Sequence, residues 1–194
     1  MSRLPIPSDT AEFDEETRAA VRHILQTRKS VPPPSSYLTY AGKAGALLSD
    51  LVEHLRYHTS LTNAETELAI CTAVRAANAD YIWDAHVRLG LQAGTREEAI
   101  DAVDTYGPLD ALTADEALIV RFGRELLDVR QVSDATYSAV RARYGEKGLL
   151  ELTALMGVYT MNATILRAMD HRAAAGTRHL TPRSRPGPSE GPLL

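Results

Sequence analysis

The feature that most constrains the fold is a helical repeat of apolar residues, which is clearest in the segment 43–58. Its apolar residues recur at the i, i+1, i+4, i+5, i+8 spacing of a helix with one core-facing side. These residues are Leu47, Leu48, Leu51, Val52 and Leu55. No segment of the sequence shows the alternation of apolar and polar residues that is typical of a strand. The sequence therefore predicts an all-α protein built as a multi-helix bundle.

Local start and stop signals place helices on both sides of that segment. A stripe formed by Val21, Ile24 and Leu25 predicts an earlier helix over residues 12–28. Thr62 is a candidate N-cap for a helix that ends near Ala77. The next predicted helix covers residues 80–93, and Gly94 follows at the position where a left-handed residue often ends a helix.

Further helix starts are predicted in the second half of the chain. The pairs Thr95 with Glu98 and Thr113 with Glu116 have the spacing of a capping box. Ser133 can cap a shorter helix that ends near Gly145. The last helix, over residues 147–172, is apolar around most of its circumference, so we expect it to be buried.

Two proline-rich segments set the expected domain limits. The run VPPPSS at residues 31–36 is expected to break any helix, because proline lacks the N–H donor and restricts the preceding residue. The chain after His179 is rich in proline and has no apolar period, which is typical of a disordered or peripheral segment. We therefore expect an N-terminal arm over 1–10, a helical domain over 11–172 with its core at 62–103, and a flexible tail over 173–194.

Composition narrows the classes of function. The net charge of −4 gives no basic footprint, so nucleic acid and anionic membranes are not expected partners. No run of about 18 apolar residues predicts a membrane span, and the first residues lack the apolar core of a secretory signal. The single cysteine cannot form an intrachain disulfide, which suits a reducing compartment. These features predict a cytoplasmic protein.

The segment ELAICTAVRAANADYIWDAHVRLG, residues 67–90, carries the best candidate for chemistry. Helical spacing places Glu67 and Cys71 on one face of its first helix, and Ile82 and His86 on one face of the second. If the two helices pack antiparallel, Glu67 meets His86. A glutamate bonded to a histidine orients the ring and raises its proton affinity, which prepares it for acid–base catalysis. A packing role for the same histidine is the alternative.

Residues 62–103 resemble the core of the carboxymuconolactone decarboxylase and alkylhydroperoxidase D superfamily. The resemblance rests on the glutamate-led helix, the small-residue break, the helix with Tyr81, Trp83 and His86, and the following AG with a capped helix. It implies a cofactor-independent lyase or isomerase, without metal, that acts on a small carboxylated lactone or enolisable acid. His86 and Glu67 would be the acid–base residues. Tyr81, Trp83 and Arg75 would bind the substrate.

The same resemblance leaves two other functions open. The peroxidase branch of the superfamily has a Cys-x-x-Cys motif before the histidine, and Ala79 and Ile82 occupy those positions here. A dithiol cycle is therefore excluded, and Cys71, among apolar residues, is expected to be a buried thiol. A non-catalytic binding or assembly protein is the remaining alternative. The resemblance also implies a homotrimer or homohexamer.

Two further patterns indicate weaker candidates. His54 and His58 lie four residues apart, a spacing that can hold a metal ion, but no third ligand with suitable spacing accompanies them. Asn162 lies with Tyr159 in the apolar last helix and must find a partner if it is buried. We expect no metal site, and core packing for the last helix.

Overall fold

The computed structural model describes residues 2–173 and 176–182, and within these ranges it contains helices and no strands. This confirms the all-α prediction. The elements are α1 (Glu15–Thr27), α2 (Pro33–Leu38), the short 3₁₀ helix η1 (Thr39–Ala41), α3 (Lys43–Tyr57), α4 (Asn63–Ala76), α5 (Asp80–Ala93), α6 (Glu97–Thr105), α7 (Ala114–Arg124), the π-helical turn η2 (Glu125–Val129) and α8 (Asp134–Ala168).

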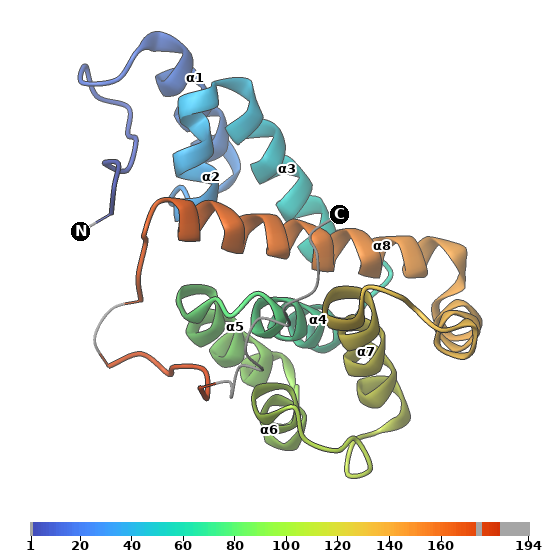
Figure 1. Cartoon of the computed structure of the whole chain (residues 1–194). Helices are drawn as coiled ribbons and strands as arrows, with labels where there is room; N and C mark the ends of the chain where they lie inside the picture. The colour runs from blue at the N-terminus through green and yellow to red at the C-terminus, as the bar shows by residue number, and fades with distance from the viewer. Residues whose placement is uncertain (1, 174–175, 183–194) are drawn as a thin grey trace, which may run out of the picture.

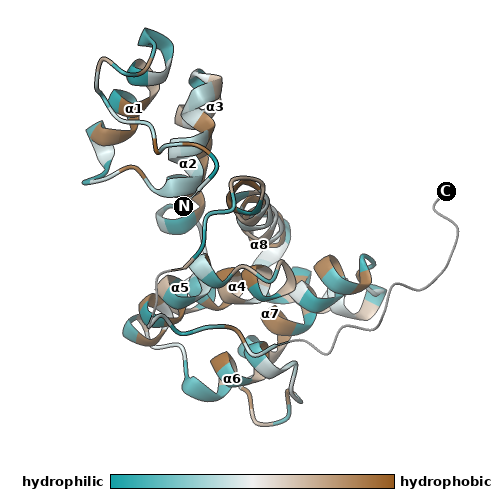
Figure 2. Cartoon of the chain, turned by 60° about the vertical axis from the view of Figure 1, so that its left-hand side comes forward, coloured by the Kyte–Doolittle hydropathy of each residue, from teal (hydrophilic) through white to brown (hydrophobic). Residues whose placement is uncertain are grey.

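The long helix α8 lies between two groups of helices (Figure 1). On one side α4 packs against α5, α7 and α8, and on the other side α2 and α3 contact α8 while α1 packs on α3. Figure 2 shows the same division from a second direction, with α8 seen nearly end-on. The most deeply buried helix is α4, whose residues from Thr66 to Arg75 are all buried.

Helix caps account for most of the helix starts. Thr62 and Thr113 each form a capping box, with Glu65 and Glu116 respectively, and Ser133 accepts a bond from the N–H of Thr136. The capping box expected at Thr95 is wrong. Helix α6 has Arg96 at its N-cap, and the Thr95 hydroxyl instead donates to the carbonyl of Ala64 across the α4–α5 interface.

The prolines at residues 32–34 start a helix rather than break one, which corrects the prediction for VPPPSS. Pro32 is the N-cap of α2 and Pro33 is its first residue. A proline in the first turn loses no hydrogen bond, because the N–H groups there have no partner within the helix, and its fixed φ already suits the helix.

Gly145 divides α8, as expected from the sequence, because its φ of 70° and ψ of 180° are not helical. The second half ends at Ala168, before the predicted limit at residue 172. By length and composition alone, α8 could cross a membrane, which the sequence reasoning did not predict. Half of its most apolar window is buried within the protein, as in a central core helix.

Three leucines predicted to face the core are exposed. Val21 and Ile24 of α1, and Leu48, Val52 and Leu55 of α3, are buried as expected. Leu25, Leu47 and Leu51 are 43%, 55% and 46% exposed, respectively. The reason is that α1 and α3 lie at one edge of the molecule, where each helix is covered on one side only (Figures 1 and 2).

Part of the tail expected to be flexible packs against the helical domain. Leu180 is buried in the core, and its backbone N–H donates to Asp80. The backbone N–H and hydroxyl of Thr181 both bond to Asp104. Side-chain carboxylates thus satisfy the backbone of this proline-rich segment. Residues 174–175 and 183–194 of the predicted tail lie outside the described residues.

Candidate functional site

The candidate site is formed where α4 and α5 pack antiparallel. Hydrogen bonds join the two helices at both ends. Near the connecting turn the Ala79 N–H donates to Val74 O, and at the far end the Thr95 hydroxyl donates to Ala64 O. Glu67 and His86 lie between these contacts. One turn after His86, Gly90 lies against Glu67 and Thr95: a Cβ there would lie 3.4 Å from the Cβ of Glu67 and 3.3 Å from the Thr95 hydroxyl.

Glu67 holds both a histidine and an arginine. The Nδ1 atom of His86 lies 2.6 Å from Oε2 of Glu67, and an Arg56 guanidinium nitrogen donates to Oε1 at 2.7 Å. Glu67 is 5% exposed and His86 is 8% exposed. Charge-assisted bonds of this length in a buried setting hold the two donors in fixed orientations.

The charges of this triad follow from burial and from the contacts. Burial by itself would raise the pKa of Glu67, but the hydrogen bond and charge of His86, together with Arg56, hold that pKa below its usual value. Burial lowers the pKa of His86 and outweighs the opposite effect of Glu67, while the Arg56 charge also lowers it. The expectation of a raised proton affinity for His86 is therefore wrong. At neutral pH the site holds an Arg56–Glu67 ion pair and a neutral imidazole whose Nδ1–H donates to Glu67.

His86 lines an inner cavity of about 210 Å³. Its Nε2 atom makes no hydrogen bond with the described residues, so its lone pair is available to a ligand. The prolines at the start of α2 form one wall, and α3, α5, α8 and Arg28, the C-cap of α1, supply the rest. The lining residues are Arg28, Pro32, Pro33, Pro34, Ser35, Val52, Arg56, Tyr81, Ile82, Ala85, His86, Tyr159 and Asn162.

The cavity wall is basic and rich in hydrogen-bond donors. Arg28 and Arg56 are its charged residues, and their side chains are 14% and 13% exposed. Tyr159 and Asn162 of α8, both nearly fully buried, add a hydroxyl and an amide. A ligand that fits this wall would carry oxygen acceptors and negative charge.

Comparison with known proteins supports the resemblance in sequence and fold. Residues 43–106 match the sequence model of the carboxymuconolactone decarboxylase family. A peroxidase-related protein from Ralstonia eutropha JMP134, described as an alkylhydroperoxidase AhpD core, has a TM-score of 0.70 at 16% identity. The match covers 90% of this chain and 93% of that chain. Residues 43–106 are thus similar in sequence to the carboxymuconolactone decarboxylase family, and the whole described chain has the alkylhydroperoxidase D-like fold.

Two further solved structures share the superfamily fold. A peroxidase-related protein from Silicibacter sp. TM1040 has a TM-score of 0.68 at 14% identity, over 90% of this chain and 92% of that chain. The debrominase Bmp8, solved as a cysteine-to-alanine variant with 2,3,4-tribromopyrrole, has a TM-score of 0.67 at 12% identity, over 86% and 89%. No curated protein matches this chain significantly in sequence.

This chain has no thiol at residues 79 and 82, the positions that correspond to the Cys-x-x-Cys motif of the peroxidase branch that it resembles. Ala79 is the N-cap of α5, and Ile82 lies one turn before His86 in the wall of the inner cavity. Cys71 is fully buried, and burial together with the charge of Glu67 raises its thiol pKa well above the usual value. It is therefore a core residue and a poor nucleophile.

The structure separates the predicted substrate-binding residues. Tyr81 lines the inner cavity, but Trp83 and Arg75 do not. Trp83 lies on the opposite side of α5 from Tyr81 and is fully buried in the core. Arg75 lies two turns beyond Glu67 on α4, where its Nε is 3.9 Å from Asp104 and its guanidinium packs over the ring of Tyr106. The predicted roles of Trp83 and Arg75 at the pocket are therefore wrong.

Sequence reasoning missed Arg56, Arg28 and the role of α2. Arg56 lies between His54 and His58, in the stretch considered for metal binding. Those two histidine rings are 5.9 Å apart, and no group of three metal-ligating side chains occurs among residues 2–173 and 176–182. Arg56 follows the core-facing Val52 by four residues, and this helical spacing is the signal that could have indicated an arginine turned toward the core.

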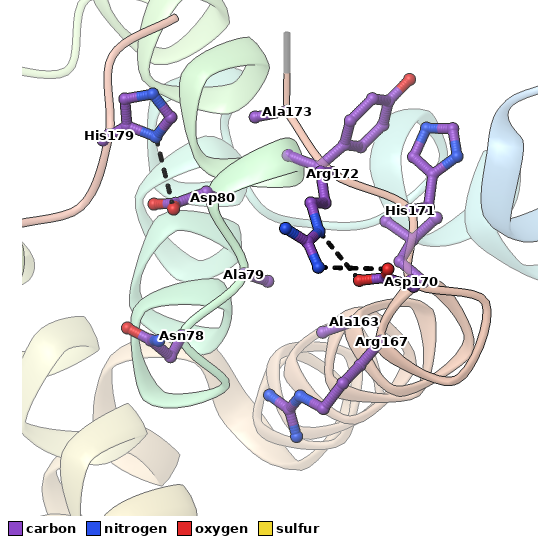
Figure 3. A pocket seen from close by; sticks show the side chains of 12 residues that line it. Asn78, Ala79, Asp80, Ala163, Arg167, Asp170, His171, Arg172, Ala173 and His179 are labelled. Carbon is purple, nitrogen blue, oxygen red and sulfur yellow. Dashed lines mark hydrogen bonds and ion pairs between the residues drawn. The ribbon is translucent and has the colours of Figure 1, made fainter. Parts of the chain in front are cut away.

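A second, outer pocket of about 360 Å³ lies at the start of α5 and the end of α8 (Figure 3). Tyr81 lines both the outer pocket and the inner cavity. Its ring packs edge-to-face on His171, whose Nδ1 atom is hydrogen-bonded to the Tyr37 hydroxyl. In the outer pocket, Asp80 pairs with His179 and Asp170 with Arg172, so its charges largely compensate each other.

Proposed function

We propose that this protein is a cofactor-independent lyase or isomerase that moves a proton on a small carboxylated lactone or enolisable acid. The observation that carries the proposal is the buried Arg56–Glu67–His86 set, which presents one ring nitrogen to a cavity. His86 is the acid–base residue, Glu67 fixes its tautomer, and Arg56 keeps Glu67 ionised.

The resting protonation state indicates the direction of the first step. A neutral imidazole with its proton on Nδ1 can accept a proton at Nε2 but cannot give one there. This favours abstraction of a C–H proton next to a carbonyl, followed by return of that proton to the same or another carbon. In a decarboxylation, His86 would first have to take up a proton before it protonated the enolate.

The basic wall supports an anionic substrate. Arg28 and Arg56 face the cavity, whereas the one carboxylate of the triad, Glu67, already bonds to two donors. The Arg28 guanidinium donates to the carbonyl of Ser49 and lies 3.9 Å from Glu53. A substrate carboxylate would bond to its remaining donors and hold the reacting carbon near Nε2. Acid–base chemistry of this kind needs only the protein's own side chains, so the proposed reaction includes no cofactor.

Other chemistry on the same fold is less well supported. The peroxidase-like alternative requires a thiolate, and the one thiol of this chain is buried with a raised pKa. That Bmp8 is a debrominase indicates that this fold carries more than one reaction type. A non-catalytic assembly role would leave the free Nε2 of His86 without a function, and a binding role would use it only as a hydrogen-bond acceptor.

Deuterium exchange tests the proposal across a whole class of substrates at once. A panel of small carboxylated lactones and 3-oxo acids would be incubated with the protein in D₂O and followed by proton NMR. We expect exchange, isomerisation or decarboxylation of one class above the buffer rate, and a loss of about 10²-fold or more in His86→Gln. The exposed His54→Gln serves as the matched control. No reaction with any compound, or full activity in His86→Gln, would contradict the proposal.

We also propose that the protein is a homotrimer or homohexamer. Leu47 and Leu51 of α3 are exposed apolar side chains that a second copy could cover. Light scattering should give a mass of three or six chains. A monodisperse monomer at micromolar concentration would refute this assembly.

A further inference from the structure

Tyr159 occupies a special position in the inner cavity. It lies on α8, is 3% exposed, and lines the cavity beside His86. The two rings pack edge-to-face with their centroids 4.9 Å apart. The tyrosine is therefore held in place by the same residue that is proposed to move the proton.

Its hydroxyl is available for a ligand. The Tyr159 O–H makes no hydrogen bond with the described residues, although a buried tyrosine hydroxyl normally finds a partner. Two other tyrosines follow the norm: Tyr37 bonds to His171, and Tyr144 donates to Glu65 at 2.9 Å. A hydroxyl in a cavity wall with its donor unused is a position for an oxygen acceptor of the ligand.

The charges around Tyr159 favour a donor over a tyrosinate. Burial raises the pKa of Tyr159 far above its usual value, and this outweighs the lowering effect of Arg56, so the O–H stays intact at neutral pH. The nearby guanidinium groups of Arg56 and Arg28 make the same region favourable for negative charge on a ligand atom.

We propose that Tyr159 is a catalytic residue that donates a hydrogen bond to the substrate's carbonyl oxygen while His86 removes the adjacent C–H proton. The inference rests on the proposed function and specifies its substrate class: a carbonyl compound with an acidic neighbouring C–H and a carboxylate. The carboxylate pairs with Arg28, and the carbonyl oxygen lies at Tyr159.

The step balances within the site. The C–H bond breaks and its proton passes to Nε2 of His86. The electron pair forms a carbon–carbon double bond, and the carbonyl π electrons move to oxygen, which becomes an enolate oxyanion. Tyr159 keeps its proton and shares it in a hydrogen bond, and the imidazolium returns its proton to carbon in the second half of the reaction. A donor placed where charge develops is worth about 10²- to 10³-fold in rate.

Phenolate binding tests this role without a known substrate. The probe is 4-nitrophenol, whose anion resembles a planar enolate, and its absorbance reports the ionised form. We expect the protein to bind the phenolate and to bind it about 10-fold or more weakly in Tyr159→Phe. Tyr144→Phe, which also loses a hydroxyl but lies outside the cavity, should bind as the wild type does. Absence of binding, or equal binding by Tyr159→Phe, would overturn the proposal.

A second readout separates this inference from the proposed function. With a substrate found by deuterium exchange, Tyr159→Phe should lower kcat by about 10²-fold with little change in KM, and the pH profile set by His86 should keep its shape. His86→Gln should abolish exchange but retain phenolate binding. If the wild type binds phenolate through Tyr159 but exchanges no compound, the proposed function fails while the oxyanion site stands. If exchange is intact in Tyr159→Phe, the catalytic role of Tyr159 fails alone.

Discussion

The two buried charges of α4 differ in what surrounds them. Glu67, in the first half of the helix, has two short bonds and faces a cavity through His86. Arg75, two turns later, is just as buried, but it packs against Tyr106 in a region with no space for a water molecule. Burial of a charge alone therefore does not indicate catalysis. The neighbouring open space and the unused ring nitrogen do.

The largest effect should come from neutralising the charge at the cavity end of α4. Glu67→Gln removes the anion that orients His86 and pairs with Arg56, so we expect deuterium exchange to fall by about 10²-fold or more. Stability should fall by about 3 kcal/mol, because the buried Arg56 loses its counter-ion. Glu151→Gln, which changes another buried glutamate outside the cavity, should retain activity. An active Glu67→Gln enzyme would contradict the claim that Glu67, unlike Arg75, has a catalytic role.

At Arg75, at the other end of α4, we expect a loss of stability without a loss of activity. Arg75→Met should lower the free energy of unfolding by about 2–3 kcal/mol in urea denaturation, since Asp104 loses a buried cation. The fraction that remains folded should catalyse deuterium exchange of the substrate at the wild-type rate. A specific loss of kcat in Arg75→Met, with stability unchanged, would restore the substrate-binding role that the sequence predicted.

The pH dependence of the free energy of unfolding should reflect His86 and Glu67, at the cavity end of α4. The folded protein binds a proton at His86 less readily than the unfolded chain does. The contribution of the neutral His86 to stability is therefore complete above the ordinary pKa of 6.5 and is lost as the pH falls through the lowered pKa. Glu67 adds a second loss as pH falls below 4.5 through its own lowered pKa. Urea midpoints measured from pH 8 to pH 4 should therefore decrease. In His86→Gln, the part of this loss that begins below pH 6.5 should shrink, and an unchanged curve would be evidence against a buried neutral imidazole.

The smallest effect is expected at the thiol, midway between the two charges. Cys71→Ala should keep deuterium exchange within about two-fold of the wild type and cost about 1 kcal/mol of stability through a small cavity. In the native protein, Cys71 should react with a thiol reagent such as DTNB only after global unfolding. Rapid labelling, or a peroxidase activity that disappears in Cys71→Ala, would contradict its assignment as a core residue.

Much of the helical pattern could be predicted from local sequence, because caps and apolar spacing act within one or two turns. The capping residues Thr62, Thr113 and Ser133 and the break at Gly145 are of this kind. The α2 helix was missed because the prolines were treated as breakers without regard to the first turn, where they are tolerated.

The candidate site was predicted in part. Helical spacing within one short segment was enough to bring Glu67 to His86, because the turn between α4 and α5 leaves the two helices adjacent. Arg56 and Tyr159 come from α3 and α8, and no local pattern records which side of those helices meets the cavity. The pKa of His86 was predicted in the wrong direction because spacing shows the partner but not the extent of burial.

The most direct test of the account is the protonation state of His86 at neutral pH, measured by ¹⁵N–¹H NMR of the imidazole nitrogens in the wild type and in Glu67→Gln. We predict a neutral ring with its proton on Nδ1 and a bare Nε2, with a pKa below 6.5, and a loss of the single-tautomer signal in the variant. A doubly protonated ring at pH 7, or a ring with its proton on Nε2, would contradict the account.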